Sequence, residues 1–177
     1  DIYSPIKEAG GFLDETPDAV VTYVENNTEE ILFAVEFCSA LQAGNQAWQR
    51  SGRAASTARS GCPYLYIVDF LKYELDSNSR ERKNVRYPNP AIPYSYINYS
   101  FESGIFCSQV YVKAEEFQPS LDPRLKDFDH ENFADEELSE FIVRKMLFLS
   151  TTEIEEALLR KCYNVVRFLS KGSNINK

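Results

Sequence analysis

Two acidic residues near the start of the chain are placed where they could face each other. Asp18 directly precedes the β-branched run 19–24, and Glu36 interrupts the apolar run 31–38. The polar turn centred on Asn27 predicts a β-hairpin that puts Asp18 opposite Glu36, with Cβ atoms roughly 5 Å apart. Two unpaired carboxylates are costly to bury, and Mg²⁺ or Mn²⁺, which prefer oxygen ligands, would remove that cost. The hairpin therefore predicts a divalent-metal site.

Each acid also has an interpretation without a metal. Pro17-Asp18 is a common turn dipeptide, so Asp18 could simply cap a turn. Glu36 could pair with Arg50 or Arg53 from the helix that is expected to follow its strand. The residues themselves leave both interpretations open.

The other elements follow from periodicity and turn residues. Segment 40–60 is rich in Ala and Gln and precedes Gly61, which predicts a helix, whereas segment 71–93 is polar, basic and interrupted by Pro, as in a loop. The expected order is a helix at 4–9, strands at 19–24 and 31–38, a helix at 40–60, a strand at 63–70, a loop at 71–93, a strand at 105–112, and helices at 134–150 and 153–170. This alternation predicts an α/β fold.

The last helix has a clear start and a clear apolar face. Thr152 with Glu155 predicts a capping box at its beginning. Its apolar stripe consists of Ile154, Leu158, Cys162, Val165 and Leu169. We expect this helix and its predecessor to pack on the core or on a neighbouring part of a longer polypeptide.

The arrangement of residues 4–70 resembles the core of the PD-(D/E)xK nucleases. The shared features are Pro17-Asp18 before one strand, Glu36 late in the next, and then a helix and another apolar strand. The resemblance implies a restriction-endonuclease-like central mixed sheet flanked by helices, here with two C-terminal helices. It also implies metal binding by Asp18, Glu36 and the backbone carbonyl of Phe37, with Glu8 as a further acid of the site.

The chain departs from the family at the catalytic lysine, whose position is taken by Cys38. A thiol poorly replaces a lysine that orients or deprotonates water. Gln42, Gln46 and Gln49 are spaced to share one face of the following helix. Gln46 is therefore the expected substitute, with Arg50 second. The alternative is that catalysis has been lost.

The same helix could contact nucleic acid. Arg50 and Arg53 would bind phosphates, while Gln42, Asn45 and Gln49 would lie near bases or the scissile phosphate. A solvated helix face explains the same polar residues. We expect Trp48 in the core rather than as a stacking platform. The basic residues Arg80, Arg82, Lys83 and Arg86 could follow a DNA backbone, or they could belong to an ordinary exposed loop.

The distribution of charge and the cysteines indicate the domain organisation and the cellular compartment. The net charge of −8 is concentrated in residues 115–140, whereas 37–68 contain no acid. We expect a nuclease-like core over 1–114 and an acidic segment with the helical pair over 115–177, within a single domain. Cys38, Cys62, Cys107 and Cys162 lack metal-site spacing, so we expect free buried thiols and a cytoplasmic protein. The first residue is not Met, which favours a piece of a longer polypeptide, and a homodimer is possible.

The leading hypothesis is a nuclease that uses Mg²⁺ or Mn²⁺ to hydrolyse DNA, of the restriction endonuclease type. Asp18 and Glu36 would hold the metal, Gln46 or Arg50 would assist the water, and Arg53 would position the strand. The alternative is an inactive nuclease-like module that binds nucleic acid or protein. A third interpretation is an unrelated α/β domain whose acids are held by arginines.

Overall fold

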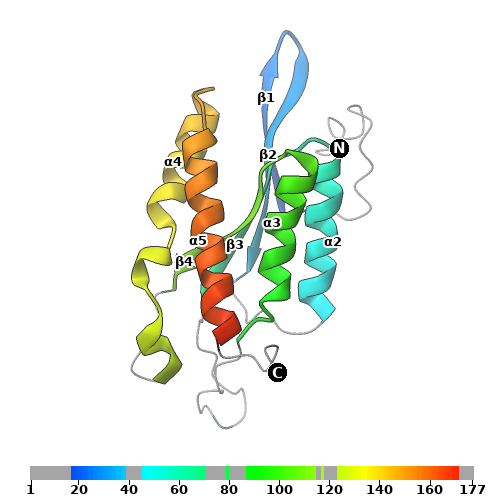
Figure 1. Ribbon diagram of the computed structural model, residues 1–177. Coiled ribbons are helices and arrows are strands. Elements are labelled where there is room, and N and C mark those ends of the chain that lie inside the picture. The colour runs from blue at the N-terminus through cyan, green and yellow to red at the C-terminus, as the bar shows by residue number, and fades with distance from the viewer. Residues whose placement is uncertain are drawn as a thin grey trace.

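A computed structural model of the chain describes residues 17–38, 45–70, 79, 87–114, 117 and 123–171. These residues form an α/β fold with a four-stranded mixed sheet in the order β1-β2-β3-β4, flanked by helices (Figure 1). The coarse α/β prediction is therefore confirmed. No helix among the described residues is both long and apolar enough to cross a membrane.

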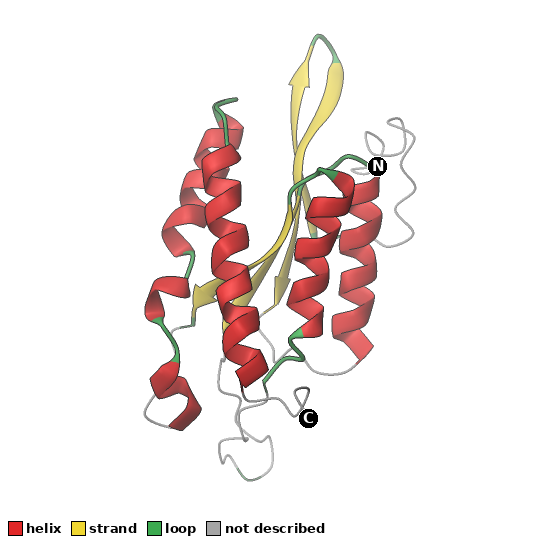
Figure 2. Ribbon diagram, in the orientation of Figure 1, coloured by secondary structure: helices red, strands yellow, loops and turns green. Residues whose placement is uncertain are grey.

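The first two strands form the predicted hairpin, which projects beyond the rest of the sheet (Figure 2). Strand β1 (Ala19–Glu25) pairs antiparallel with β2 (Thr28–Cys38), and Asn26 and Asn27 turn the chain with φ angles of 51° and 63°. Positive φ at both central residues matches a two-residue hairpin turn whose twist suits the strands. A register shift between Val21 and Thr22 leads to the pairing of Ala19 with Val35, the register that puts Asp18 beside Glu36.

The rest of the sheet is parallel. Helix α2 (Asn45–Arg59) connects β2 to β3 (Tyr64–Phe70), and α3 (Ala91–Ser103) lies between β3 and β4 (Cys107–Lys113) in the chain. Parallel neighbours need such crossover connections. Gly61 follows α2 with a φ of 78°, consistent with the predicted glycine stop.

Helices cover both faces of the sheet. Alternate β2 residues point to opposite faces, so Ala34 and Cys38 pack with α2 and α3 in one apolar cluster, while Phe33 and Val35 pack with Phe141 of α4 (Asp135–Met146) in another. Helix α5 (Thr152–Lys171) contributes to both clusters. Short 3₁₀ turns at Pro123–Asp127 and His130–Asn132 precede α4.

The expected loop over 71–93 and the expected order of elements are both wrong at one point, because a helix, α3, begins at Ala91. Its sequence is rich in Tyr and Ile, which is more typical of a strand. Pro90 and Pro93 lie at the cap and in the first turn, where a missing N–H costs no helical hydrogen bond, and Gly104 ends the helix with a φ of 68°. Burial of Ile92, Tyr96 and Ile97 against the core stabilises the helix over its local preference.

The stripe predicted for α5 is confirmed, because all five of its residues are buried. At its start Thr151, one residue before the predicted cap, contacts Glu155. The Thr151 hydroxyl donates to Glu155 Oε1 at 2.7 Å, and the Glu155 N–H donates to the Thr151 carbonyl at 2.8 Å. Thr151 is buried, whereas Thr152 is exposed.

Candidate functional site

Glu36 is fully buried, and both oxygens of its carboxylate have partners. Arg53 Nη1 lies 2.7 Å and Arg50 Nε 3.1 Å from Oε1, while the Tyr64 hydroxyl donates to Oε2 at 2.8 Å. The two guanidinium groups come from α2, and Tyr64 comes from the neighbouring strand β3. Pairing with arginine, which the sequence left open, is therefore what neutralises this acid in the structure.

Arg50 extends the network further across the sheet. Its Nη1 donates to the Tyr66 hydroxyl at 2.7 Å and to Cys38 Sγ at 3.1 Å. The ring of Tyr66 in turn stacks on Tyr96 of α3, with centroids 5.8 Å apart. One arginine thus ties together β2, β3 and, through an aromatic pair, α3. A network of this kind holds one fixed arrangement when its members are satisfied.

Burial keeps the two tyrosine hydroxyls protonated. Burial, reinforced by the negative charge of Glu36, holds the pKa of Tyr64 well above its usual range. Burial also raises the pKa of Tyr66, with Cys38 adding to the effect and Arg50 opposing it. Tyr64 therefore remains a hydrogen-bond donor to Glu36 across the physiological pH range.

Asp18 lies beside Glu36 but has a different role. Its side chain is exposed, and its Oδ2 accepts a hydrogen bond from the backbone N–H of Phe37 at 2.9 Å. The side chain of Phe37 is 55% exposed. The bond ties the residue before β1 to Phe37 near the end of β2, so Asp18 joins the two strands and does not cap a local turn through this bond.

The donor set at this end of the hairpin does not fit the expected Mg²⁺ or Mn²⁺ ion. Among the described residues, no group of three His, Cys, Asp or Glu side chains could hold a metal ion. The oxygens of Glu36 already face two cations and a phenol, which occupy three of its about four lone-pair positions, and the two guanidinium groups would repel a metal ion brought to the same carboxylate. Glu8, the further acid implied by the resemblance, lies outside the described residues.

The other residues predicted to assist catalysis or to contact nucleic acid are described only in part. Gln49 is exposed on α2, whereas Gln42 lies outside the described residues. Asn45 and Gln46 belong to the first turn of α2, and only their backbone is described, so the role predicted for Gln46 stays a prediction. The basic residues Arg80, Arg82, Lys83 and Arg86 also lie outside the described part of the chain.

Two residues of this region correct or extend the sequence analysis. Trp48 is 52% exposed, so the prediction that it belongs to the core is wrong. Its neighbour on the helix, Ala47, is the buried residue, because α2 turns its small side chains toward the sheet. The Glu36 partner Tyr64 was missed, although period-two alternation in β3 places Tyr64 and Tyr66 on one face.

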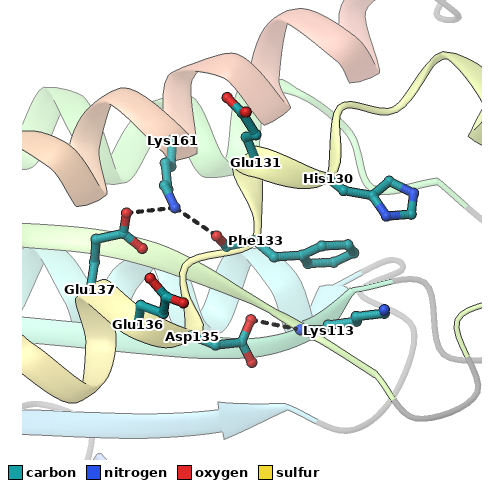
Figure 3. A pocket seen from close by; sticks show the side chains of 8 residues that line it. All are labelled: Lys113, His130, Glu131, Phe133, Asp135, Glu136, Glu137 and Lys161. Atoms are coloured by element: carbon teal, nitrogen blue, oxygen red, sulfur yellow. Dashed lines mark hydrogen bonds and ion pairs between the residues drawn. The ribbon is translucent and has the colours of Figure 1, made fainter.

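A second, acid-rich pocket of about 550 Å³ lies where α4 begins (Figure 3). Lys161 Nζ lies 2.6 Å from Glu137 Oε1 and donates to the Phe133 carbonyl at 2.7 Å, while Asp135 Oδ2 accepts from the Lys113 N–H at 3.3 Å. Acids in the first turn of a helix stabilise its positive end. These contacts join Asp135 to β4 and Lys161 of α5 to Glu137 of α4, so they serve the packing of α4 and α5.

Comparison with known proteins identifies no relative for the chain. No family model, curated protein or solved structure matches it. The resemblance to PD-(D/E)xK nucleases consequently stays a prediction that rests on the hairpin acids and the order of the elements.

Proposed function

We propose that this domain is a nuclease-like module that binds a protein partner and does not hydrolyse phosphodiester bonds. The observation that carries the proposal is that both carboxylate oxygens of Glu36 already contact the protein, through Arg50, Arg53 and Tyr64. A catalytic carboxylate must present oxygens to a metal ion, and here those oxygens are engaged by the protein itself. Cys38, at the position of the family's lysine, accepts a hydrogen bond from Arg50 instead of facing a reacting group.

The exposed surface supports a protein partner. Two large apolar side chains that are about half exposed or more line one hollow of the surface, Phe101 at 78% on α3 and Tyr163 at 47% on α5. Exposed apolar groups gathered on a soluble domain typically mark an interaction surface. The net charge of −8 disfavours a polyanionic partner.

Calorimetric titration of Mn²⁺, with plasmid nicking assayed in parallel, tests the non-catalytic part of the proposal. We expect no stoichiometric binding and no metal-dependent nicking by the wild type, and the same results for Glu36→Gln. The circular dichroism spectrum of each protein provides the control for folding. One-site Mn²⁺ binding that is lost in Glu36→Gln, together with nicking by the wild type, would overturn the proposal.

A metal-dependent DNA nuclease is the second candidate. The observation in its favour is the pairing of Ala19 with Val35, which brings the exposed carboxylate of Asp18 to the same end of the hairpin as Glu36. In this candidate Arg50 and Arg53 leave Glu36 and turn to the phosphates of the substrate. Both guanidinium groups are about a quarter exposed, so solvent already reaches them. The same titration and nicking assay separate the two candidates.

A further inference from the structure

Helices α3 and α5 pack side by side (Figures 1 and 2). Two hollows of about 470 and 560 Å³ follow the helix pair, and both are lined by Tyr94 and Tyr163. The two hollows adjoin at these two rings, and together we call them the α3–α5 groove. Phe101 lines one end together with Leu159, and Ala91 lines the other end.

The groove has an apolar floor and aromatic walls. Ile97 is buried beneath it and Leu159 is half-buried, while Tyr94, Phe101 and Tyr163 are 45%, 78% and 47% exposed. From Ala91 to Phe101 the helix axis runs for about 15 Å at 1.5 Å per residue. This length matches about three turns of a second helix, whose side chains at i, i+4 and i+7 could reach the floor.

One wall of the groove is basic. Arg160, Arg167 and Lys171 are exposed along one side of α5, at a spacing that keeps them in line. None of the three makes an ion pair with another residue in the part of the chain that the structure describes. Three exposed cations beside an apolar floor are complementary to a partner that is apolar on one face and acidic along one edge.

The distribution of charge favours a helical peptide over nucleic acid. The cations stand on the α5 wall alone, and Glu156 lines the groove near Phe101. A continuous phosphate backbone would lie against this carboxylate, whereas one edge of a peptide can place acids beside the three cations and a neutral residue beside Glu156. The net charge of −8 also opposes a polyanion over the whole molecule.

We propose that the groove between α3 and α5 binds an amphipathic helix of a partner protein, with apolar side chains on the floor and acidic side chains along Arg160, Arg167 and Lys171. This inference rests on the proposed function of the domain as a protein-binding module. It adds the surface, the secondary structure of the partner segment and the sign of its charge.

Selection from a phage-displayed library of helical peptides, each about 15 residues long to allow about four turns, tests the proposal. The library varies the apolar positions and allows Glu, Lys or Ala along one edge. Selection on the wild type, with counter-selection on Phe101→Ala/Tyr163→Ala, is expected to enrich apolar side chains at i, i+4 and i+7 with Glu on the edge. Fluorescence anisotropy of the best peptide should show at least tenfold weaker binding to the double variant.

Reversal of charge provides the sharper readout. Arg167→Glu/Lys171→Glu should weaken binding of the Glu peptide at least tenfold and restore binding of the same peptide with Lys on its edge. Phe148→Ala, a matched loss of an exposed aromatic ring outside the groove, should leave binding unchanged. The proposal is overturned by selected peptides without an acidic bias, by equal binding to the double variant, by a single-stranded oligonucleotide that binds in place of the peptides, or by a dimer that covers Phe101.

The outcome for the groove is separable from the outcome for the proposed function. If no peptide depends on Phe101 and Tyr163 while Mn²⁺ binding and nicking are also undetected, the groove is not the binding surface and the non-catalytic proposal stands. If nicking is detected, the proposed function itself has failed, whatever the peptides do.

Discussion

The Asp18 carboxylate accepts a hydrogen bond from the Phe37 backbone N–H at 2.9 Å, and this bond separates the roles of the two acids at the end of the hairpin. Asp18 is exposed and fastens the beginning of β1 to the end of β2. Glu36, its neighbour across the hairpin, is buried and turned toward the arginines of α2. In this structure the antiparallel register that would suit a shared metal ion places Asp18 in a cross-strand hydrogen bond and Glu36 in a buried ion cluster.

Replacement of Asp18 tests its hydrogen bond with Phe37. Asp18→Ala removes the acceptor for the Phe37 N–H and should lower the free energy of unfolding by about 1 kcal/mol. Asp18→Asn keeps a side-chain oxygen at the same place and should cost less than Asp18→Ala. Urea unfolding measures the difference, and hydrogen exchange of the Phe37 amide locates it. A Phe37 amide that remains equally protected in Asp18→Ala would contradict this role.

The cluster around Glu36 should behave as one energetic unit. Removing both cations in Arg50→Ala/Arg53→Ala leaves a buried carboxylate with Tyr64 as its partner, which should cost about 3–5 kcal/mol. Each single variant should cost less, because the other guanidinium group remains within 3.1 Å of Glu36. Urea unfolding of all variants measures these losses.

Adding Glu36→Gln to the double arginine variant provides the matched test. The amide carries no charge to leave unpaired, so it should recover about 1–3 kcal/mol of the loss. Arg59→Ala, on the same helix but without an ion pair to any described residue, should change stability by less than about 0.5 kcal/mol. Additive losses, with no recovery by Glu36→Gln, would show that the arginines do not act through this carboxylate.

The hairpin was predictable because its information is local. Alternation of period two predicts which side chains share a face, and the two Asn residues mark the turn. The two-residue turn pairs Glu25 with Thr28, one residue away from the predicted register, and the shift between Val21 and Thr22 restores the predicted pairing near Asp18. The register shift between Val21 and Thr22 was not foreseen, since nothing in the local pattern marks an extra residue there.

The partner of Glu36 was less predictable because it depends on tertiary geometry. Both arginines were named as possible partners, but the position of α2 over β2 decides whether they or a metal ion neutralise the acid. The same geometry decides that Trp48 faces solvent while Ala47 faces the sheet. Helix α3 escaped prediction because burial of its Tyr and Ile side chains outweighs their preference for strands.

The turn of the hairpin allows a test of backbone conformation alone. Asn27 has a φ of 63°, which an Ala residue adopts at a cost of about 1 kcal/mol. Asn27→Ala should therefore destabilise the domain by about that amount, whereas Asn27→Gly should be neutral or stabilising because Gly adopts positive φ freely. Thermal unfolding of the two variants gives the comparison, and equal midpoints would exclude a positive φ at this position in solution.

Buried thiols predict a loss of stability at alkaline pH. Burial raises the pKa of Cys62 and of Cys162 to about 12, above the usual thiol value of about 8.5. Between these two pH values the unfolded chain loses the thiol protons and the folded chain keeps them, so stability is complete below the lower value and falls as pH rises toward 12. Each thiol should contribute a slope of about 1.4 kcal/mol per pH unit in that window.

The Cys162→Ala variant isolates one of these contributions. Its free energy of unfolding, measured by urea titration between pH 8 and 11, should fall less steeply with pH than that of the wild type, by about 1.4 kcal/mol per unit. Val165→Ala removes a buried apolar group from the same helix and carries no titrating proton, so it should lower stability at every pH without changing the slope. Parallel slopes for wild type and Cys162→Ala would mean that this thiol ionises equally in the folded and unfolded states, which its complete burial against Ser108 and Gln109 argues against.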